Sequence, residues 1–249
     1  MVMPTVHSQP ASSQHVHGGT ARTEAGAKAG VLFDMDGVLV LSNPAHLAAW
    51  QEFARQRLGL EITAEMFYRS ISGRKNEEAL AELFPGKFTP EQLAAISREK
   101  EAFYRERYGP TLQPVPGVLE LIADLRRIAA QRPVALAVAT SGPPENARLV
   151  LGRFGITSAF SAVLTGSQVT KSKPDPTIYL LAAQALNVLP QRCVVLEDAT
   201  AGVQAAKRAS MRCLAVATSE PAQRLLQAGA DRVEPDFRGV TGQQLLQML

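Results

Sequence analysis

The sequence predicts an α/β protein: a doubly wound parallel sheet, a Rossmann-like core, with an inserted helical cap. After about residue 117, short apolar runs alternate with helical periods, which requires right-handed crossovers between parallel strands. A long helical segment separates the first apolar run from this alternating part. We therefore expect a disordered tail at 1–28, a core formed by 29–42 and 114–249, and a helical cap at 43–113.

The composition is typical of a folded cytoplasmic protein. With 249 residues, 46% of them apolar, the chain can fill a sizeable core. No apolar run reaches the roughly 20 residues that cross a bilayer, and the polar tail lacks the apolar core of a secretory signal. The net charge of +3 comes without a basic block, so we expect neither nucleic acid nor membrane as a partner. Cys193 and Cys213 lie in apolar runs, as reduced core cysteines do.

The first apolar run ends in two carboxylates. Asp34 and Asp36 follow Val31–Phe33, and Gly37 comes next, where the backbone can turn away. Strand side chains alternate, so the two aspartates would share a face if the strand continued. Carboxylates this close raise each other's pKa unless a cation lies between them. A hard divalent ion, Mg²⁺, is the expected cation.

Helix signals fill the segment after the first strand. Pro44 begins one helix at an early position, Thr63 can cap a second, and Thr89 followed by Pro90 begins a third. The chain leaves this segment through the proline-rich stretch 113–117, which we expect to be a stiff hinge. A helical cap that can move against the core is the expected result.

Strands and helices alternate after the hinge. Val118, Leu121, Ile122 and Leu125 recur at helical spacing, and the apolar run 133–139 is the next expected strand. The further expected elements are a helix from about 144, a strand at 162–164, a helix at 176–186, a strand at 193–196, a helix ending at 210 and a strand at 213–217.

Reactive residue types follow the expected strand ends. The carboxyl ends of parallel strands share one edge of the sheet, so residues after them should form one site. Four groups of such residues occur. Taken alone, each group could be a solvated turn, a helix cap or surface charge. Their occurrence in this order at successive strand ends favours transfer of a phosphoryl group onto a carboxylate. The groups are Asp34 with Asp36, then Thr140, Ser141 and Gly142, then Lys173, and finally Glu197 with Asp198.

The charges suggest a mechanism. A phosphate ester is anionic, so a carboxylate can attack it only beside a cation, for which we expect Mg²⁺ held by Asp34, Asp198 and a backbone carbonyl. Asp34 would be the nucleophile and form an aspartyl-phosphate. Asp36 would protonate the leaving oxygen and later activate water. Lys173 would neutralise the anionic charge, and Thr140 with the amides after it would hold phosphate oxygens.

Four segments resemble the signature motifs of the haloacid dehalogenase-like hydrolases, over about residues 30–230. They are FDMDGVL at 33–39, the hydroxyl at Thr140, KPDPTIY at 173–179 and LEDATAGVQAA at 196–206. The run AHLAAWQEF at 45–53 is similar to the β-phosphoglucomutase and sugar-phosphatase branch. The resemblance implies the same roles for Asp34, Asp36, Thr140 and Lys173. It also implies a Mg²⁺ shell of Asp34, Asp36 through its carbonyl, Asp198 and Glu197.

Two positions depart from the family pattern. Relatives often have Asp-Ser or Asp-Thr after the first motif, where this chain has Leu41-Ser42-Asn43, a change that can alter the hinge or the leaving-group pocket. A serine often follows the acidic pair of the fourth motif, where this chain has Ala199 and Thr200. Neither departure removes a catalytic group.

Cap residues are candidates for substrate binding. His46 and Trp50 share a helix face, and the resemblance implies that the histidine contacts the catalytic acid and the tryptophan lines the pocket; cap core is the alternative. The segment containing Gly73, Arg74, Lys75 and Asn76 matches the specificity loop of the family. Its cations could bind a second phosphate or a sugar, or lie at a solvated helix start.

Lys100 is a further candidate for a cap contact with substrate. It lies on an otherwise charged helix, which favours exposure to solvent instead. A mutase needs a cap arginine for the distal phosphate, and Asn76 stands where that arginine is expected. The missing arginine favours a phosphatase.

Three hypotheses follow. The first is a Mg²⁺-dependent phosphatase, monomeric, that acts on a small phosphorylated metabolite such as a sugar phosphate. The second is a β-phosphoglucomutase-type phosphosugar mutase. The third is a non-enzymatic phosphate-binding module, which the complete set of catalytic residues disfavours.

Overall fold

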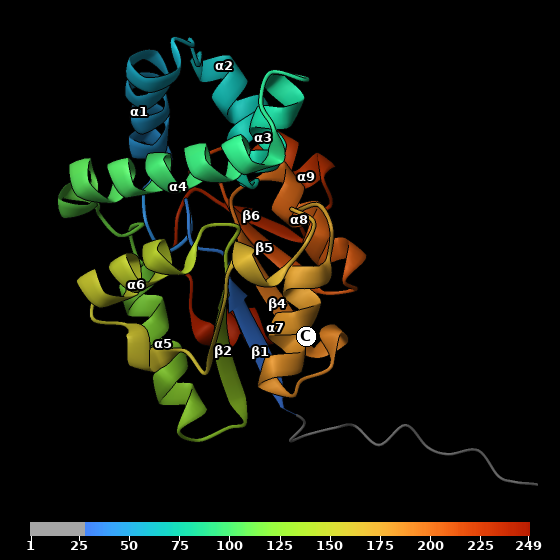
Figure 1. Cartoon of the computed structure of the whole chain (residues 1–249). Helices are drawn as coiled ribbons and strands as arrows, with labels where there is room; N and C mark the ends of the chain where they lie inside the picture. Colours follow the sequence, from blue (N-terminus) through green and yellow to red (C-terminus); the bar gives the residue numbers. More distant parts are fainter. Residues whose placement is uncertain (1–27) are drawn as a thin grey trace, which may run out of the picture.

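The protein contains one six-stranded parallel sheet in the order β3-β2-β1-β4-β5-β6 (Figure 1). The structure is a computed structural model and describes residues 28–249, so the predicted tail at 1–28 lies outside the described residues except for Lys28. The order places β1 between β2 and β4, which confirms the predicted doubly wound α/β class. The strands are β1 (Ala29–Phe33), β2 (Val134–Ala139), β3 (Ala162–Leu164), β4 (Cys193–Glu197), β5 (Arg212–Val216) and β6 (Arg232–Glu234).

Helices cover both faces of the sheet because alternate strand side chains point to opposite sides. Val31 and Phe33 of β1 pack into one hydrophobic cluster, and Leu32 packs into the other. The first face is covered by α5 (Val118–Ala129), α6 (Pro144–Arg153) and α10 (Gly242–Leu246). The second is covered by α7 (Thr177–Leu186), α8 (Thr200–Arg208) and α9 (Ala222–Gln227).

The helical segments between β1 and α5 form a layer above the sheet (Figure 1). They bury a hydrophobic cluster of their own that includes Trp50, Phe67 and Leu80. This separate cluster supports the predicted cap, whose limits at 43 and 113 remain a prediction. The helices are α1 (Asn43–Phe53), α2 (Ala64–Met66), α3 (Asn76–Leu83) and α4 (Pro90–Arg107).

The predicted helix starts are confirmed at the level of single hydrogen bonds. Pro44 lies in the first turn of α1. The Thr63 hydroxyl accepts a hydrogen bond from the Met66 amide at 3.1 Å, and Thr89 forms a reciprocal capping box with Gln92. None of the helices in 28–249 is both long and apolar enough to span a membrane.

Two features differ from the sequence prediction. The first strand ends at Phe33, and the chain then turns, with Gly37 at φ 74° and Asp36 bridged to Val40. Asp34 and Asp36 therefore do not share a strand face. The elements β6, α9 and α10 were not predicted, because none exceeds six residues and such short segments carry little periodicity.

Candidate active site

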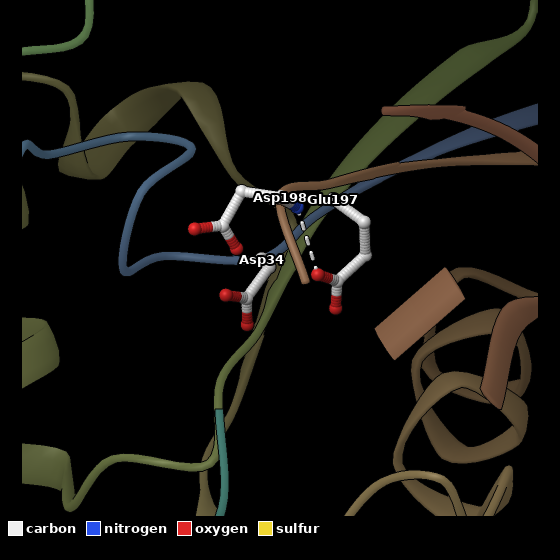
Figure 2. A group of neighbouring side chains, drawn as sticks. All are labelled: Asp34, Glu197 and Asp198. Carbon is white, nitrogen blue, oxygen red and sulfur yellow. Dashed lines mark hydrogen bonds between the residues drawn. The ribbon is translucent and has the colours of Figure 1, made fainter. Parts of the chain in front are cut away.

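Three buried carboxylates meet where β1 and β4 end (Figure 2). Asp34 follows β1, Glu197 ends β4 and Asp198 follows it; each has one oxygen within 4.8 Å of an oxygen of each other residue. Their exposed fractions are 6%, 1% and 2%. The sequence prediction that these groups share one edge of the sheet is thus matched by the geometry.

Two glycines make room for this cluster. A Cβ atom on Gly37 would overlap Oδ2 of Asp198, and Gly37 also has a positive φ. A Cβ atom on Gly202, in the first turns of α8, would overlap Oε1 of Glu197. The carboxylates can approach because both positions lack side chains.

Lys173 is the single ammonium within hydrogen-bond distance of this cluster among the described residues. Its Nζ lies 2.7 Å from Oδ1 of Asp34 and 2.7 Å from Oε1 of Glu197. Burial alone would lower the pKa of Lys173, but the two carboxylates outweigh burial and raise it above its ordinary value. Lys173 therefore stays charged and offsets part of the negative charge.

Glu197 is fully engaged by the protein. Its Oε1 also accepts a hydrogen bond from the hydroxyl of Tyr179, and its Oε2 accepts the amides of Asp198 and Ala199 at 3.0 and 3.3 Å. Both oxygens thus have partners, which suits a residue that holds Lys173 in place. Asp34 keeps Oδ2 free of any protein partner in the described part of the chain.

The carboxylates carry more negative charge than one lysine can offset. Burial, together with the charges of Glu197 and Asp36, raises the pKa of Asp34 from 3.8 to about 7, although Lys173 opposes this. Burial and the charge of Glu197 also raise the pKa of Asp198 well above its ordinary value. A set of crowded carboxylate oxygens fits a hard divalent cation such as Mg²⁺. The donor chemistry therefore agrees with the magnesium prediction.

We expect the metal-free protein to lose stability as the pH rises from about 4 to about 7. The folded chain holds the Asp34 proton more tightly, with a pKa of about 7 against 3.8, so protonation favours the fold and this advantage disappears as the pH rises. At about 1.4 kcal/mol per pH unit, the loss is on the order of 4 kcal/mol. Thermal unfolding in EDTA should give a lower Tm at pH 7.5 than at pH 5.

Added Mg²⁺ should raise the Tm more at pH 7.5 than at pH 5, because ionised carboxylates bind the ion. An Asp34→Asn variant serves as the control, because it should lose the part of the pH dependence that Asp34 contributes and keep the part that Asp198 contributes. An equal Mg²⁺ effect at both pH values would contradict a metal site built from these carboxylates.

Asp36 lies apart from the cluster and faces the cap. Its Oδ1 accepts a hydrogen bond from the Ser42 hydroxyl and lies 3.4 Å from Nε2 of His46. Burial alone would raise the pKa of Asp36, but the hydrogen bonds from His46 and Ser42 lower it. The predicted contact between the cap histidine and this carboxylate is therefore present in the structure.

Lys100 is buried, so the favoured interpretation of it as a solvent-exposed residue was wrong. It is 1% exposed. Its helix, α4, lies on the side of the cap that is nearest to the core (Figure 1). Its Nζ lies 2.8 Å from Nδ1 of His46 and 2.8 Å from Oε1 of Glu101. Tyr104 stacks on the His46 ring at 3.7 Å between ring centroids.

The loop after β2 supplies the predicted phosphate-binding groups. Thr140 is buried, and its hydroxyl oxygen accepts the Gly142 amide at 3.0 Å, which leaves its proton free to donate. The Ser141 hydroxyl instead donates to the carbonyl of Gly73 at 2.9 Å. Ser141 thus joins the core to the cap, and its backbone amide remains the candidate for phosphate.

A cavity of about 390 Å³ lies between the cap and the core. Asp36, His46 and Gly142 line it, as does the predicted specificity loop of the cap. Trp50 borders the cavity but is 0% exposed, so it is also part of the cap core. The structure thus supports Trp50 as cap core, and its contact with substrate remains a prediction.

The cations of the specificity loop are already paired. Nη1 of Arg74 lies 2.6 Å from Oε2 of Glu82, and Nζ of Lys75 donates to the carbonyl of Val169 in the core. Asn76 donates to Oε1 of Glu101 at 2.8 Å. The sequence placed these residues at the cavity correctly but could not show their partners.

Several residues of the site were not predicted as functional. Asn43 donates to Oδ2 of Asp198 at 3.2 Å, and the Ser219 hydroxyl contacts the same oxygen. With Ser42 on Asp36, two of the three residues of the departure after the first motif touch carboxylates of the site. That departure was the available signal for Ser42 and Asn43, and the motif at 173–179 was the signal for Tyr179. Ser219 and Glu101 had none.

These features define a site for phosphoryl transfer at the carboxyl edge of a doubly wound sheet, under a helical cap. Residues 28–210 match the family model described as haloacid dehalogenase-like hydrolase. The chain belongs to this family, in the branch of β-phosphoglucomutases and sugar phosphatases with a cap, and is a phosphohydrolase.

Relatives include both a phosphatase and a mutase. The chain is 34% identical over 197 residues to validoxylamine A 7'-phosphate phosphatase of Streptomyces hygroscopicus subsp. limoneus, an alignment covering 79% of this chain and 89% of that protein. It is 31% identical over 199 residues to the β-phosphoglucomutase of Bacillus subtilis, covering 77% and 84%. The crystal structure of CbbY from Rhodobacter sphaeroides in complex with phosphate has a TM-score of 0.77 at 29% identity, covering 88% and 99%.

Proposed function

We propose that the protein is a Mg²⁺-dependent phosphatase that hydrolyses a small monophosphate ester, such as a sugar phosphate, through an aspartyl-phosphate. The charge of the cavity favours a phosphatase over a mutase. The cations of the specificity loop, Arg74 and Lys75, already bond to Glu82 and to the carbonyl of Val169. A phosphatase has to bind only one phosphate. A mutase also has to hold a second phosphate far from the nucleophile.

In this proposal the free Oδ2 of Asp34 attacks phosphorus, and the bond from phosphorus to the leaving oxygen breaks. The anionic phosphate favours the protonated form of Asp36, so this carboxyl enters the step protonated although His46 and Ser42 lower its pKa in the free protein. Its proton passes to the leaving oxygen, so the alcohol leaves uncharged. A water molecule then attacks the aspartyl-phosphate and gives a proton to Asp36. Inorganic phosphate leaves, and Asp34 returns to its carboxylate form.

The remaining groups hold the phosphoryl charge. Lys173 donates to Oδ1 of Asp34 and directs the other oxygen toward the substrate. Thr140 and the amides after it would bind phosphate oxygens. Mg²⁺ would be held by Asp34, Asp198 and the carbonyl of Asp36, where it supplies positive charge that offsets the approach of two anions. Glu197 would not bind Mg²⁺ directly, because both of its oxygens already accept hydrogen bonds from the protein. It would instead hold Lys173 beside the residues that bind the ion.

The cavity offers little to a second phosphate. Three cations line it, and each has a partner: Arg74 pairs with Glu82, Lys75 with a carbonyl, and Lys100 with Glu101. Carboxylates at 77, 78 and 101 line the same space and would repel a distal phosphate. An uncharged polyol with many hydroxyl groups suits these walls better.

We expect phosphate release from sugar and polyol monophosphates with Mg²⁺, and a KM at least about tenfold higher for a matching bisphosphate. Phosphate release over a panel of such pairs measures this preference. A Glu82→Gln variant frees Arg74 and should lower the KM for bisphosphates while leaving monophosphates nearly unchanged.

Conversion of β-glucose 1-phosphate into glucose 6-phosphate without phosphate release would instead establish the mutase. Preference for bisphosphates in the unaltered protein would contradict the charge argument. A cytoplasmic location and a monomeric state remain predictions.

A further inference from the structure

A buried polar network joins the cap to the core next to the cavity. Oε2 of Glu101, on cap helix α4, accepts a hydrogen bond from Nδ2 of Asn146 on core helix α6 at 2.6 Å. Oε1 of the same carboxylate accepts from Lys100 and Asn76, both at 2.8 Å. Nη1 of Arg105, one turn further along α4, donates to Oδ1 of Asn146 at 2.9 Å.

The orientation of Asn146 is fixed by its two partners. A carboxylate only accepts and a guanidinium only donates, so the amide NH₂ must face Glu101 and the amide oxygen must face Arg105. Asn146 is 1% exposed and Glu101 is 6% exposed, so water has little access to replace either bond. The charge-assisted bond to Glu101 is of the strong kind.

The network continues to the candidate acid/base. Lys100 is held by Glu101 and lies 2.8 Å from Nδ1 of His46. An ammonium cannot accept, so Nδ1 accepts and the neutral ring carries its proton on Nε2. Nε2 is the atom that faces Oδ1 of Asp36, at 3.4 Å. The tautomer of His46 is thus set by groups that Glu101 positions.

We propose that Asn146 is a positioning residue that completes the general acid/base only while the cap is closed. It is the one member of the network from Asn76 to His46 that the core supplies; the others all lie on the cap. Closure brings Asn146 onto Glu101, which fixes Lys100 and through it His46 and Asp36. This inference rests on the proposed phosphatase, in which Asp36 protonates the leaving group.

The test is an Asn146→Asp variant, which keeps size and the acceptor for Arg105 but loses the donor to Glu101. On a sugar monophosphate, kcat should fall about 10- to 100-fold with KM little changed, because an alkoxide leaving group needs a proton. On p-nitrophenyl phosphate, whose leaving group is stable without a proton, kcat should fall less than about threefold. An Arg105→Gln variant loosens the same cap contact and should affect both substrates equally.

A second measurement does not depend on activity. ¹⁵N NMR of imidazole nitrogens at pH 7.5 should show His46 as the Nε2–H tautomer in the unaltered protein and in Arg105→Gln, and a mixture in Asn146→Asp. A His46→Asn variant assigns the signal among the four histidines. Wild-type protein that releases no phosphate would refute the phosphatase, whereas the tautomer result would still decide the role of Asn146.

The proposal would be overturned if Asn146→Asp lowered kcat equally on both substrates, changed KM alone, or left the His46 tautomer unaltered. Asn146 would then be only a contact between the cap and the core. If Asn146→Asp fails to fold, Asn146→Ala removes the donor without adding charge. The same pattern of leaving-group dependence and tautomer mixing is then expected from it.

Discussion

Replacing Asp34 with asparagine is expected to lower phosphate release by at least about 10⁴-fold while the fold is retained. Asparagine has no anionic oxygen to attack phosphorus, and loss of a covalent nucleophile typically has an effect of this size. The variant also lacks one of the two aspartates expected to bind Mg²⁺. Phosphate release from the best monophosphate of the panel measures the effect.

The stability of this variant provides the check. Asparagine removes a buried carboxylate whose pKa is raised to about 7, so metal-free Asp34→Asn should unfold at a higher temperature than wild type at pH 7.5. Asp124→Asn, on α5 and paired with Arg127, is a matched aspartate outside the site and should keep full activity. An active Asp34→Asn enzyme would exclude Asp34 as the nucleophile.

Replacing Lys173 with methionine is expected to destabilise the protein by about 3 to 5 kcal/mol and to inactivate it. Methionine fills a similar volume but leaves Asp34 and Glu197 without the cation that lies 2.7 Å from each. Breaking a buried ion pair by removing one partner has a cost of about this size. Urea unfolding without metal measures the stability, and phosphate release with Mg²⁺ measures the activity.

Lys171→Met is the control, because Lys171 is exposed two residues away. Its free energy of unfolding should change by no more than about 0.5 kcal/mol. Mg²⁺ should restore part of the stability of Lys173→Met, since a divalent ion also offsets the carboxylates. An unchanged urea midpoint in Lys173→Met would mean that Lys173 does not compensate the cluster.

The closed cap connects these expectations to specificity. Lys75 and Ser141 each bond across from cap to core, and Glu78 accepts the amide of Ser172 at 3.0 Å. Substrate must enter while such contacts are open, and they must form again before the acid acts. Two of the residues predicted to bind substrate, Lys75 and Ser141, therefore also join the cap to the core.

The sequence alone determined the fold class and the core of the site. Apolar runs with helical segments between them predict a parallel sheet, and parallel strands bring their ends together regardless of loop detail. For that reason the order of residues along the chain was enough to assign Asp34, Lys173, Glu197 and Asp198 to one place.

Only the tertiary structure decided the partners of the cap residues. Lys100 lies on a helix that carries many charged side chains, so the sequence pattern indicated exposure to solvent. In the structure α4 packs within the folded protein and Lys100 is buried. Asn146 meets Glu101 from 45 residues away, and Asn43 meets Asp198 from 155 residues away. Such pairs depend on how separate elements pack, and hydrophobic periodicity records only which face of one element is buried.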